Sequence, residues 1–328
     1  MANATATHSA PTRPTPAGSR QRRMVALISY LAPNPGMSPA PLEGVKYLHA
    51  NRPLPRSPVF YEPSICILAQ GRKRGYLGDE TFVYDAQQYL VLSVPLPFEV
   101  ETEASEAEPL LGLALNVDLA VLAEMLMAID QAGHHMPAAP KGIFATPLDD
   151  ALGDAVLRLL EILAGPEIER RLLGPGILRE IYYRVLTGAQ GGALRAALAH
   201  HSQFGKVAKA LRRIHQEFDG DLDVAALASE AGMSPAAFHA HFKAVTQTSP
   251  IQYLKTTRLH RARLIMVQEG ANAAVAAVRV GYESPSQFSR EFKRLFGRSP
   301  VEEARFMKNL LAVPPVMRRT DQAFPTAP

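Results

Sequence analysis

A short sequence pattern occurs twice in this chain, 50 residues apart, and it constrains the fold of the C-terminal third more than any other feature. The first copy runs from Ser234-Pro235 to Ser249-Pro250, and the second from Ser284-Pro285 to Ser299-Pro300. Serine is a preferred helix N-cap, and proline fits the first helical position, where its missing N–H is no loss. The repeat therefore predicts two similar helical units.

Each unit has the layout of two helices joined by a tight turn. A short apolar segment precedes a glycine, Gly232 in the first copy and Gly281 in the second, and glycine accepts the positive φ of such a turn. The helix that follows carries two phenylalanines four residues apart: Phe238 and Phe242, then Phe288 and Phe292. Residues four apart share one helix face, so that face is buried and the positions between point outward. This is the helix-turn-helix arrangement, whose second helix enters the major groove of DNA.

The segment between the two copies, residues 250–268, reads as one long helix. Its 19 residues span roughly 28 Å at ~1.5 Å per residue. Successive major-groove faces on one side of B-DNA lie about 34 Å apart. The spacing is suited to placing two recognition helices in adjacent major grooves.

Residues from about 205 to 310 resemble the DNA-binding domain of the AraC/XylS family of bacterial transcription factors. The resemblance rests on ordered motifs: Leu227-Ala228 with Gly232-Met233-Ser234, Ser249-Pro250 with Tyr253-Leu254, Arg258-Leu259 with Ala262-Arg263, Val280 to Ser284, Gln287 to Arg290, and Phe296 to Pro300. They extend over about a hundred residues, so the resemblance is far more specific than a single helix-turn-helix pattern.

By this resemblance, the second recognition helix places Ser286, Gln287 and Arg290 on base edges. Ser284, Ser289, Lys293 and Arg294 would lie near phosphates. Arginine can bind guanine with two hydrogen bonds and glutamine can bind adenine, whereas lysine is a point charge for phosphate. The alternative is that Arg290 pairs with Glu291 or Glu283 on a solvated helix face.

The first recognition helix carries shorter side chains. Its DNA-binding set by the same resemblance is Ser234, Ala236, Ala237, His239 and Ala240, with Lys243 at the phosphate position. Alanine offers only apolar contact to thymine methyl groups. His239 is then the main hydrogen-bonding candidate, and His241 either joins it or is partly buried between the phenylalanines. We expect the second unit to contribute more hydrogen-bonded sequence discrimination.

Charge and cysteine content fit a DNA-binding protein of a reducing compartment. Residues 201–310 carry 16 Lys and Arg against 10 Asp and Glu, whereas residues 1–200 carry 17 against 20. The single cysteine, Cys66, excludes an intrachain disulfide. The apolar run Met24 to Ala32 is too short to span a bilayer and is expected to be a short helix packed on the body. We therefore expect a cytoplasmic protein without membrane contact.

The N-terminal half changes to a strand pattern between about residues 42 and 117. Short apolar segments alternate with turn signals such as Gln70-Gly71 and Gly78-Asp79, which predicts a sandwich or barrel. Glu99, Glu101 and Glu103 alternate and are expected on a solvated strand face. Helices are expected at 119–129, 148–163 and 178–186.

This half resembles the cupin-like N-terminal domain of one branch of the same family. The resemblance rests on Tyr61 to Ser64, Gln70 to Lys73, Leu77-Gly78, Tyr84-Asp85, Tyr89-Leu90, Ser93 to Pro97 and Pro109 to Gly112. It implies a module for sensing or dimerisation, with any effector inside the barrel. The predicted fold class is two-domain α+β: a cupin-like β-barrel with flanking helices, then an all-α domain with two helix-turn-helix motifs joined by a long helix.

The expected domain organisation has five parts. Residues 1–41 are mostly disordered or short-helical, with disorder over 1–20, and residues 42–186 form the cupin-like domain. Residues 187–204 form a linker, 205–310 the DNA-binding domain and 311–328 a flexible tail. Several short strands followed by helices, with a glycine-rich stretch before the repeat, support these bounds.

No cofactor, metal or catalytic site is expected. Metal-dependent cupins use histidine and carboxylate ligands on neighbouring strands, and no histidine lies between His49 and His134. The adjacent pairs His134-His135 and His200-His201 do not face one site. Candidate effector-binding residues are Cys66, Gln70 and Tyr84. Cys66 is either packed in the barrel or a thiol sensor activated by Arg72, Lys73 or Arg74.

The sequence leaves three functions open. The first is a DNA-binding transcription regulator, an activator by family habit, that senses a small molecule. The second is a regulator whose barrel only dimerises or contacts RNA polymerase. The third is a cupin-type enzyme fused to a DNA-binding domain, which the missing histidines disfavour. The expected partners are double-stranded DNA, RNA polymerase, a small-molecule effector and a second copy of the chain.

Overall fold

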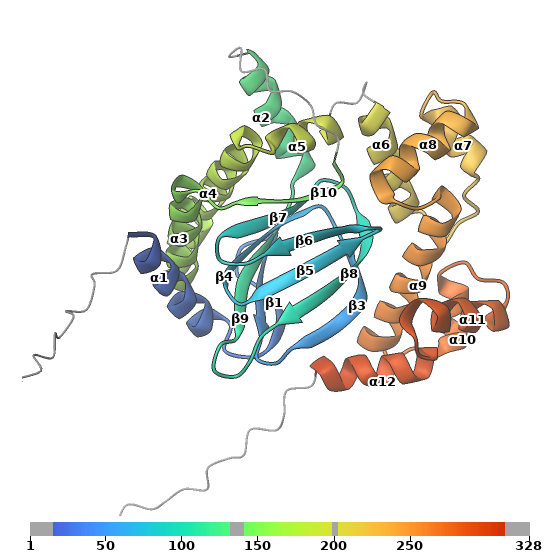
Figure 1. Ribbon diagram of the computed structural model, residues 1–328, viewed down its shortest axis with the longest axis horizontal. Helices are drawn as coiled ribbons and strands as arrows, with labels where there is room; N and C mark the ends of the chain where they lie inside the picture. The colour runs from blue at the N-terminus through green and yellow to red at the C-terminus, as the bar shows by residue number, and fades with distance from the viewer. Residues whose placement is uncertain (1–15, 132–140, 199–202, 312–328) are drawn as a thin grey trace, which may run out of the picture.

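A computed structural model describes residues 16–131, 141–198 and 203–311. A β-barrel of two sheets lies at the centre of Figure 1, with helices on two opposite sides. The described helices before the DNA-binding region are α1 (Pro16–Leu31), α2 (Leu119–Gln131), α3 (Asp150–Ala164), α4 (Glu167–Thr187) and α5 (Gly191–Leu198). Helices α1, α3 and α4 cover one side of the barrel, and the C-terminal helices cover the other.

The strands form a six-stranded and a four-stranded antiparallel sheet. The first has the order β1-β2-β9-β4-β7-β10 and the second β3-β8-β5-β6. Their bounds are β1 (Gly36–Pro39), β2 (Val45–Ala50), β3 (Leu54–Tyr61), β4 (Ser64–Gln70), β5 (Arg72–Leu77), β6 (Glu80–Tyr84), β7 (Gln88–Leu92), β8 (Leu96–Glu103), β9 (Leu110–Asn116) and β10 (Ile143–Pro147). This confirms the predicted barrel.

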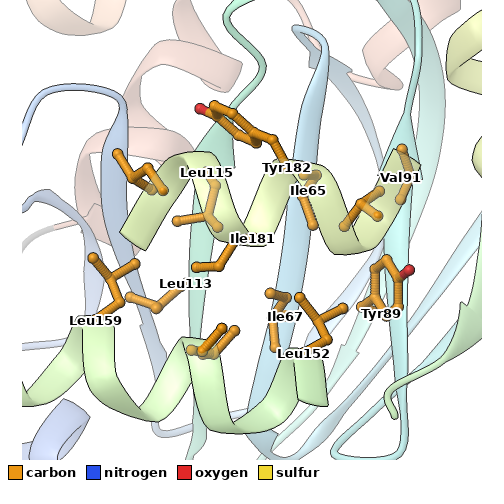
Figure 2. Packing of buried hydrophobic residues seen from close by; sticks show 14 of the residues in the cluster. Ile65, Ile67, Tyr89, Val91, Leu113, Leu115, Leu152, Leu159, Ile181 and Tyr182 are labelled. Carbon is orange, nitrogen blue, oxygen red and sulfur yellow. The ribbon is translucent and has the colours of Figure 1, made fainter. Parts of the chain in front are cut away.

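The six-stranded sheet is apolar on both faces because each face has its own partner. Residues Ile65 and Ile67 of β4 pack outward against α3 and α4, as Figure 2 shows for these and neighbouring side chains. The alternate residues, Cys66 and Leu68, belong to the core inside the barrel. A strand covered on both sides reads as a continuous apolar run, which explains the Ile-Cys-Ile-Leu sequence.

The four-stranded sheet is apolar on its inner face only. Along β8, Leu96, Phe98 and Val100 are buried, and the glutamates alternate with them. Glu99 pairs with Arg56 of β3, and Glu101 and Glu103 pair with Arg74 of β5. The three glutamates therefore lie on a polar outer face, as predicted, within a ladder of cross-strand ion pairs.

The C-terminal region is a string of helices built around the repeat. It contains α6 (Gln203–Gln216), α7 (Val224–Glu230), α8 (Pro235–Thr246), α9 (Pro250–Gln268), α10 (Ala273–Arg279), α11 (Pro285–Phe296) and α12 (Pro300–Leu311). The side chains of Ser234, Ser249 and Ser284 accept hydrogen bonds from backbone N–H groups at the starts of α8, α9 and α11. The predicted caps and the 19-residue connecting helix are confirmed.

The two turns of the repeat take the positive φ that their glycines were expected to supply. Gly232 has φ 60° and Gly281 has φ 79°. Arg258 of α9 fastens the second turn, because its guanidinium donates to the carbonyl oxygens of Gly281 at 3.0 Å, Phe218 at 2.7 Å and Gly220 at 2.8 Å. The first turn has no equivalent clamp among the described residues.

Several expectations about elements differ from the structure. Residues 16–20 belong to α1, so the disorder expected over 1–20 is wrong there, while residues 1–15 and the tail from 312 lie outside the described residues. The expected linker 187–204 contains α5, which forms because its Ala193, Leu194 and Ala197 pack into the core. Helix α4 begins 11 residues before the predicted 178 and continues through Pro175.

Substitution of the two turn glycines tests this difference between the turns. We expect Gly232→Ala to lose about 1–2 kcal/mol of unfolding free energy, the cost of a left-handed L-residue. A Cβ at Gly232 meets only the Lys206 ammonium at 3.8 Å, whereas one at Gly281 would lie 2.6 Å from the Asp219 carbonyl oxygen. Gly281→Ala should therefore lose more, measured by urea denaturation. Equal losses of unfolding free energy in the two variants would contradict the tighter packing of the second turn.

Candidate nucleic-acid interface and domain junction

Helix α11 presents the polar side chains predicted for the second recognition helix. Phe288 and Phe292 are buried, and this orients the opposite face outward. Ser286, Gln287, Ser289, Arg290, Lys293 and Arg294 are exposed on it, and Ser284 is partly exposed at the N-cap. The structure thus brings the whole predicted set to the accessible surface of one helix.

The charged groups of α11 divide into paired and unpaired ones. Glu291 accepts hydrogen bonds from Lys255 of α9 at 2.8 Å and from Tyr282 at 2.7 Å, and the partners lower the pKa of its carboxyl against the opposing effect of burial. Gln287 also donates to Glu291, at 3.2 Å. Among the described residues Arg290 has no carboxylate within ion-pair distance, so the alternative pairing with Glu291 or Glu283 is absent.

Helix α8 has the same framework with a different surface. Phe238 and Phe242 are fully buried, and Ala236, His239, Ala240 and Lys243 are exposed, with Ala237 partly exposed. Ser234 is the exposed N-cap. His241 is exposed too, so the expected alternative of burial between the phenylalanines is wrong. The first unit therefore offers mostly apolar surface and two imidazoles.

A junction between the barrel and the DNA-binding region was not foreseen from the sequence. Phe60 of β3 stacks on His215 of α6, with ring centroids 4.8 Å apart and planes within 2°. The same phenylalanine lies 6.2 Å from the Tyr253 ring and 5.9 Å from the His260 ring, both on α9. One outward-facing aromatic of the barrel thus contacts two helices of the other domain.

Polar contacts surround this aromatic centre. Tyr253 donates to the carbonyl oxygen of Pro95 at 2.8 Å in a buried position. Glu62 contacts His215 and lies 3.4 Å from Arg261, and these contacts lower the pKa of its carboxyl against the opposing effect of burial. Arg263 donates to the Pro58 carbonyl oxygen at 3.1 Å. In the sequence, Phe60 lies in a strand interrupted by prolines. This segment has no periodic apolar pattern, so nothing in it predicts a partner for Phe60.

The candidate effector residues are not all in one place. Cys66 and Tyr84 are buried together in the core inside the barrel. Gln70 instead lies at the end of β4, where it donates to the Pro109 carbonyl oxygen at 2.8 Å and lines a polar surface cavity of about 540 Å³ with Arg72, Asp85 and Glu103. The role of these residues in binding an effector stays a prediction.

Burial governs the chemistry of Cys66. Desolvation raises the pKa of its thiol, and the charge of Lys73 opposes this only partly. Arg72 and Arg74 face outward into ion pairs with Asp85, Glu101 and Glu103. The environment therefore favours the neutral, packed thiol over a reactive thiolate.

Two family models match the chain, and together they cover more than half of it. A model described as the AraC-type transcriptional regulator N-terminus matches residues 41–193, and a helix-turn-helix domain model matches residues 227–305. The chain belongs to the AraC/XylS family of transcription regulators.

Curated relatives match part of this AraC-family chain. A probable transcriptional regulator LumQ of Photobacterium leiognathi is 32% identical over 95 residues, which is 29% of this chain and 38% of the relative. The regulator AlkR of Acinetobacter baylyi is 33% identical over 95 residues, 29% of this chain and 31% of that protein. The activator RclR of Escherichia coli is 40% identical over 79 residues, which is 24% of this chain and 28% of that protein. The chain thus spans about a third of the length of these relatives.

Solved structures show a similar fold for most of the AraC-family chain. A crystal structure of ToxT from Vibrio cholerae with an unsaturated fatty acid bound matches 83% of this chain and 96% of ToxT, with a TM-score of 0.54 and 12% identity. ToxT bound to (E)-4-(8-methylnaphthalen-1-yl)but-3-enoic acid matches 80% of this chain and 99% of ToxT, with a TM-score of 0.55 and 10% identity. At these identities the likeness concerns the fold alone.

The described residues contain neither a helix that could span a membrane nor a cluster of metal ligands. No described helix is both long and apolar enough to cross a membrane. Within residues 16–131, 141–198 and 203–311, no three histidine, cysteine or carboxylate side chains gather as metal ligands do. The pairs His134-His135 and His200-His201 lie outside the described residues.

Thiol labelling tests the environment of Cys66. Because this cysteine is 2% exposed and its pKa is raised, we expect 5,5′-dithiobis(2-nitrobenzoate) to modify the folded protein only slowly at pH 7.5. The same reagent in 6 M guanidinium chloride should modify one thiol per chain. Complete labelling of the folded protein within the mixing time would indicate a reactive thiolate and contradict the packed thiol.

Proposed function

We propose that this chain is a sequence-specific DNA-binding regulator that activates transcription, and that its barrel domain responds to a small molecule. The observation that carries the DNA-binding part is the pair of helix-turn-helix units joined by α9, with the polar face of α11 exposed. A basic surface without side chains that contact base edges would support only nonspecific DNA binding. Helix α11 carries basic side chains and also side chains that can contact base edges.

The two units are proposed to read DNA differently. Arg290 and Gln287 can hydrogen-bond to base edges, whereas Ala236, Ala237 and Ala240 of α8 can only contact thymine methyl groups or follow groove shape. Lys243, Lys293 and Arg294 are proposed to neutralise phosphates. Ser234, Ser284 and Ser289 would then hydrogen-bond to the DNA backbone. Ser234 and Ser284 also cap the N-termini of their own helices.

The proposal of an effector has its support in ToxT, which has a similar fold and whose crystal structures hold a fatty acid or a naphthalenyl-butenoic acid. Activation further requires contact with RNA polymerase, and a homodimer would bring two such readers to one operator. The protein would act in the cytoplasm, where the bacterial chromosome lies.

Two substitutions on α11 test base reading against phosphate contact. The DNA site is first obtained by selecting bound duplexes from a random pool. Arg290→Ala should cost about 1–3 kcal/mol on that site and relax the preference at one base pair. Lys293→Ala should weaken binding to all duplexes alike and reduce the salt slope by about 1. Binding is measured by fluorescence anisotropy at several salt concentrations. Unchanged specific binding by Arg290→Ala would show that α11 is not the base reader.

Base substitutions in the selected site test the asymmetry between the units. Mutating each base pair under α11 and under α8 in turn should give larger penalties under α11, because only that helix offers a bidentate arginine. Penalties are measured by competition against the unmodified duplex. Equal penalties in the two half-elements would contradict the asymmetry while leaving DNA binding itself intact.

A further inference from the structure

A basic groove lies along α6, beside the turn of the first helix-turn-helix unit. It has a volume of about 620 Å³, and its cations are Lys206, Lys209 and Arg212 of α6. These three follow one another at every third position, so they share one side of the helix. The buried face of α6 packs into the core and turns this row outward, and its residues are Phe204, Val207, Ala208, Leu211 and Ile214.

The three cations of the groove have no counter-ion. Among the described residues, no carboxylate lies within ion-pair distance of Lys206, Lys209 or Arg212. Glu230 also lines the groove, but its carboxylate is paired with Arg213. Burial lowers the pKa of the Arg212 guanidinium, which nevertheless stays protonated at neutral pH. Three uncompensated positive charges favour an anionic partner.

The second unit shows what covers the corresponding place there. Helices α6 and α9 each end at a glutamine that a glutamate follows, and counting back from these ends puts Lys206 at the position of Arg258. A Cβ at Gly281 would lie 3.1 Å from the Arg258 guanidinium, just as one at Gly232 would lie 3.8 Å from the Lys206 ammonium. Residues 218–220 cover Arg258 and accept its hydrogen bonds. Lys206 has no such acceptor among the described residues, and its surroundings form the open groove.

The groove adjoins the reading surface proposed for the first unit. Gly232 precedes Ser234, the N-cap of α8, by two residues, and Ser234 is already proposed to contact the DNA backbone. The N-terminal residues of a recognition helix contact base edges, and phosphates line the edges of the groove that the helix enters. A row of cations beside this turn is therefore suited to phosphates just beyond the base pairs under α8.

The other residues of the groove favour DNA over an acidic protein. Protein interfaces are usually anchored by aromatic side chains in well-packed pockets. Between its charged side chains the groove is lined only by Gly205, Ala231 and Gly232, which offer no such anchor. Phosphate binding requires little beyond positive charge and close approach, and small residues permit that approach.

We propose that Lys206, Lys209 and Arg212 form a third DNA contact, which binds the phosphates that flank the base pairs under α8. The inference rests on the proposed function, since it extends the footprint of a DNA-binding regulator. None of the three belongs to the set predicted from the sequence, in which Lys243 is the one basic residue of the first unit apart from histidine. The contact supplies affinity that the alanines of α8 do not provide, and it adds no base discrimination.

The salt dependence of DNA binding tests this contact in the full-length protein. Lys206, Lys209 and Arg212 are replaced together by glutamine, and binding to the selected duplex and to a scrambled one is followed by fluorescence anisotropy. Each phosphate contact contributes about 0.9 to the slope of log K against log salt, so this α6 variant should lose about 2 to 3 of the slope. Both affinities should fall by the same factor, at least about tenfold at physiological salt. Lys206→Arg, Lys209→Arg and Arg212→Lys together should keep the wild-type slope.

Shortened duplexes locate the contact on the DNA. The base pair whose preference is relaxed by Arg290→Ala marks the α11 side of the selected site. Trimming the opposite flank, beyond the base pairs under α8, should lower the affinity and the slope of the wild-type protein. The α6 variant should be insensitive to this trimming. Trimming beyond α11 should affect both proteins alike.

A matched control replaces three exposed arginines on the opposite side of the barrel (Figure 1) by glutamine: Arg22 and Arg23 of α1 and Arg171 of α4. It removes the same charge and should keep the wild-type slope. The proposal is overturned if the α6 variant keeps that slope, which would leave the groove to an acidic protein. It is also overturned if the control loses as much slope, or if trimming beyond α8 affects wild type and α6 variant equally.

Failure of this contact and failure of the proposed function give different results. In each of the three overturning cases, a wild-type protein that prefers the selected duplex over the scrambled one keeps its proposed function. A wild-type protein with no preference between the duplexes would lose the proposed function itself, whatever the slope of the α6 variant.

Discussion

The contact of Phe60 with helices α6 and α9 is the constraint on which the arrangement of the two domains depends. Stacking on His215 joins the barrel to α6, and the edges of Tyr253 and His260 join it to α9. Aromatic pairs of this kind contribute about 0.5–1.5 kcal/mol each beyond their buried area. Helix α9 connects both helix-turn-helix units. The contacts of β3 with α9 therefore influence the positions of both α8 and α11. Figure 1 shows α9 beside β3 and β8, between the barrel and α10 and α11.

The repeat is symmetric in its framework and asymmetric on its surfaces. Both units have a serine N-cap, a glycine at positive φ and two buried phenylalanines. The ends of the reading helices differ, because Gly297 closes α11 while Gln247 takes the same left-handed conformation after α8, at φ 58°. A glutamine is strained in that conformation, and its side chain lies 3.4 Å from where a Cβ of Gly78 on the barrel would be. The first unit thus departs from the repeat where it meets the barrel.

Local sequence signals predicted much of this fold. The parts that they did not predict have identifiable physical reasons. The caps, turns and phenylalanine spacing of the repeat are encoded within a few residues, so α7 to α11 follow from the sequence. Strands β1 and β10 lie outside the strand region expected at about 42–117. Strand β3 lies inside that region, but Pro55 and Pro58 break the usual alternating pattern. They are tolerated because β3 is an edge strand and its register shifts between Leu54 and Ser57. Helix α4 was truncated because Gly174-Pro175-Gly176 resembles a turn. The outward-facing residues of α11 were predicted by position in the repeat. The junction instead joins residues 153 to 205 positions apart, and no local pattern encodes it.

His260 of the junction also contacts α11, so it connects the barrel to the second helix-turn-helix unit. Its ring contacts Phe60 of the barrel and Phe296 of α11, while its Nδ1 faces Arg263, which in turn holds Glu303 of α12. A molecule that binds only where the barrel and α11 come together stabilises that arrangement by its binding free energy, and by reciprocity any DNA that favours another arrangement weakens its binding. The strength of such coupling is limited by the difference in affinity between the two arrangements, about 1.4 kcal/mol for each factor of ten.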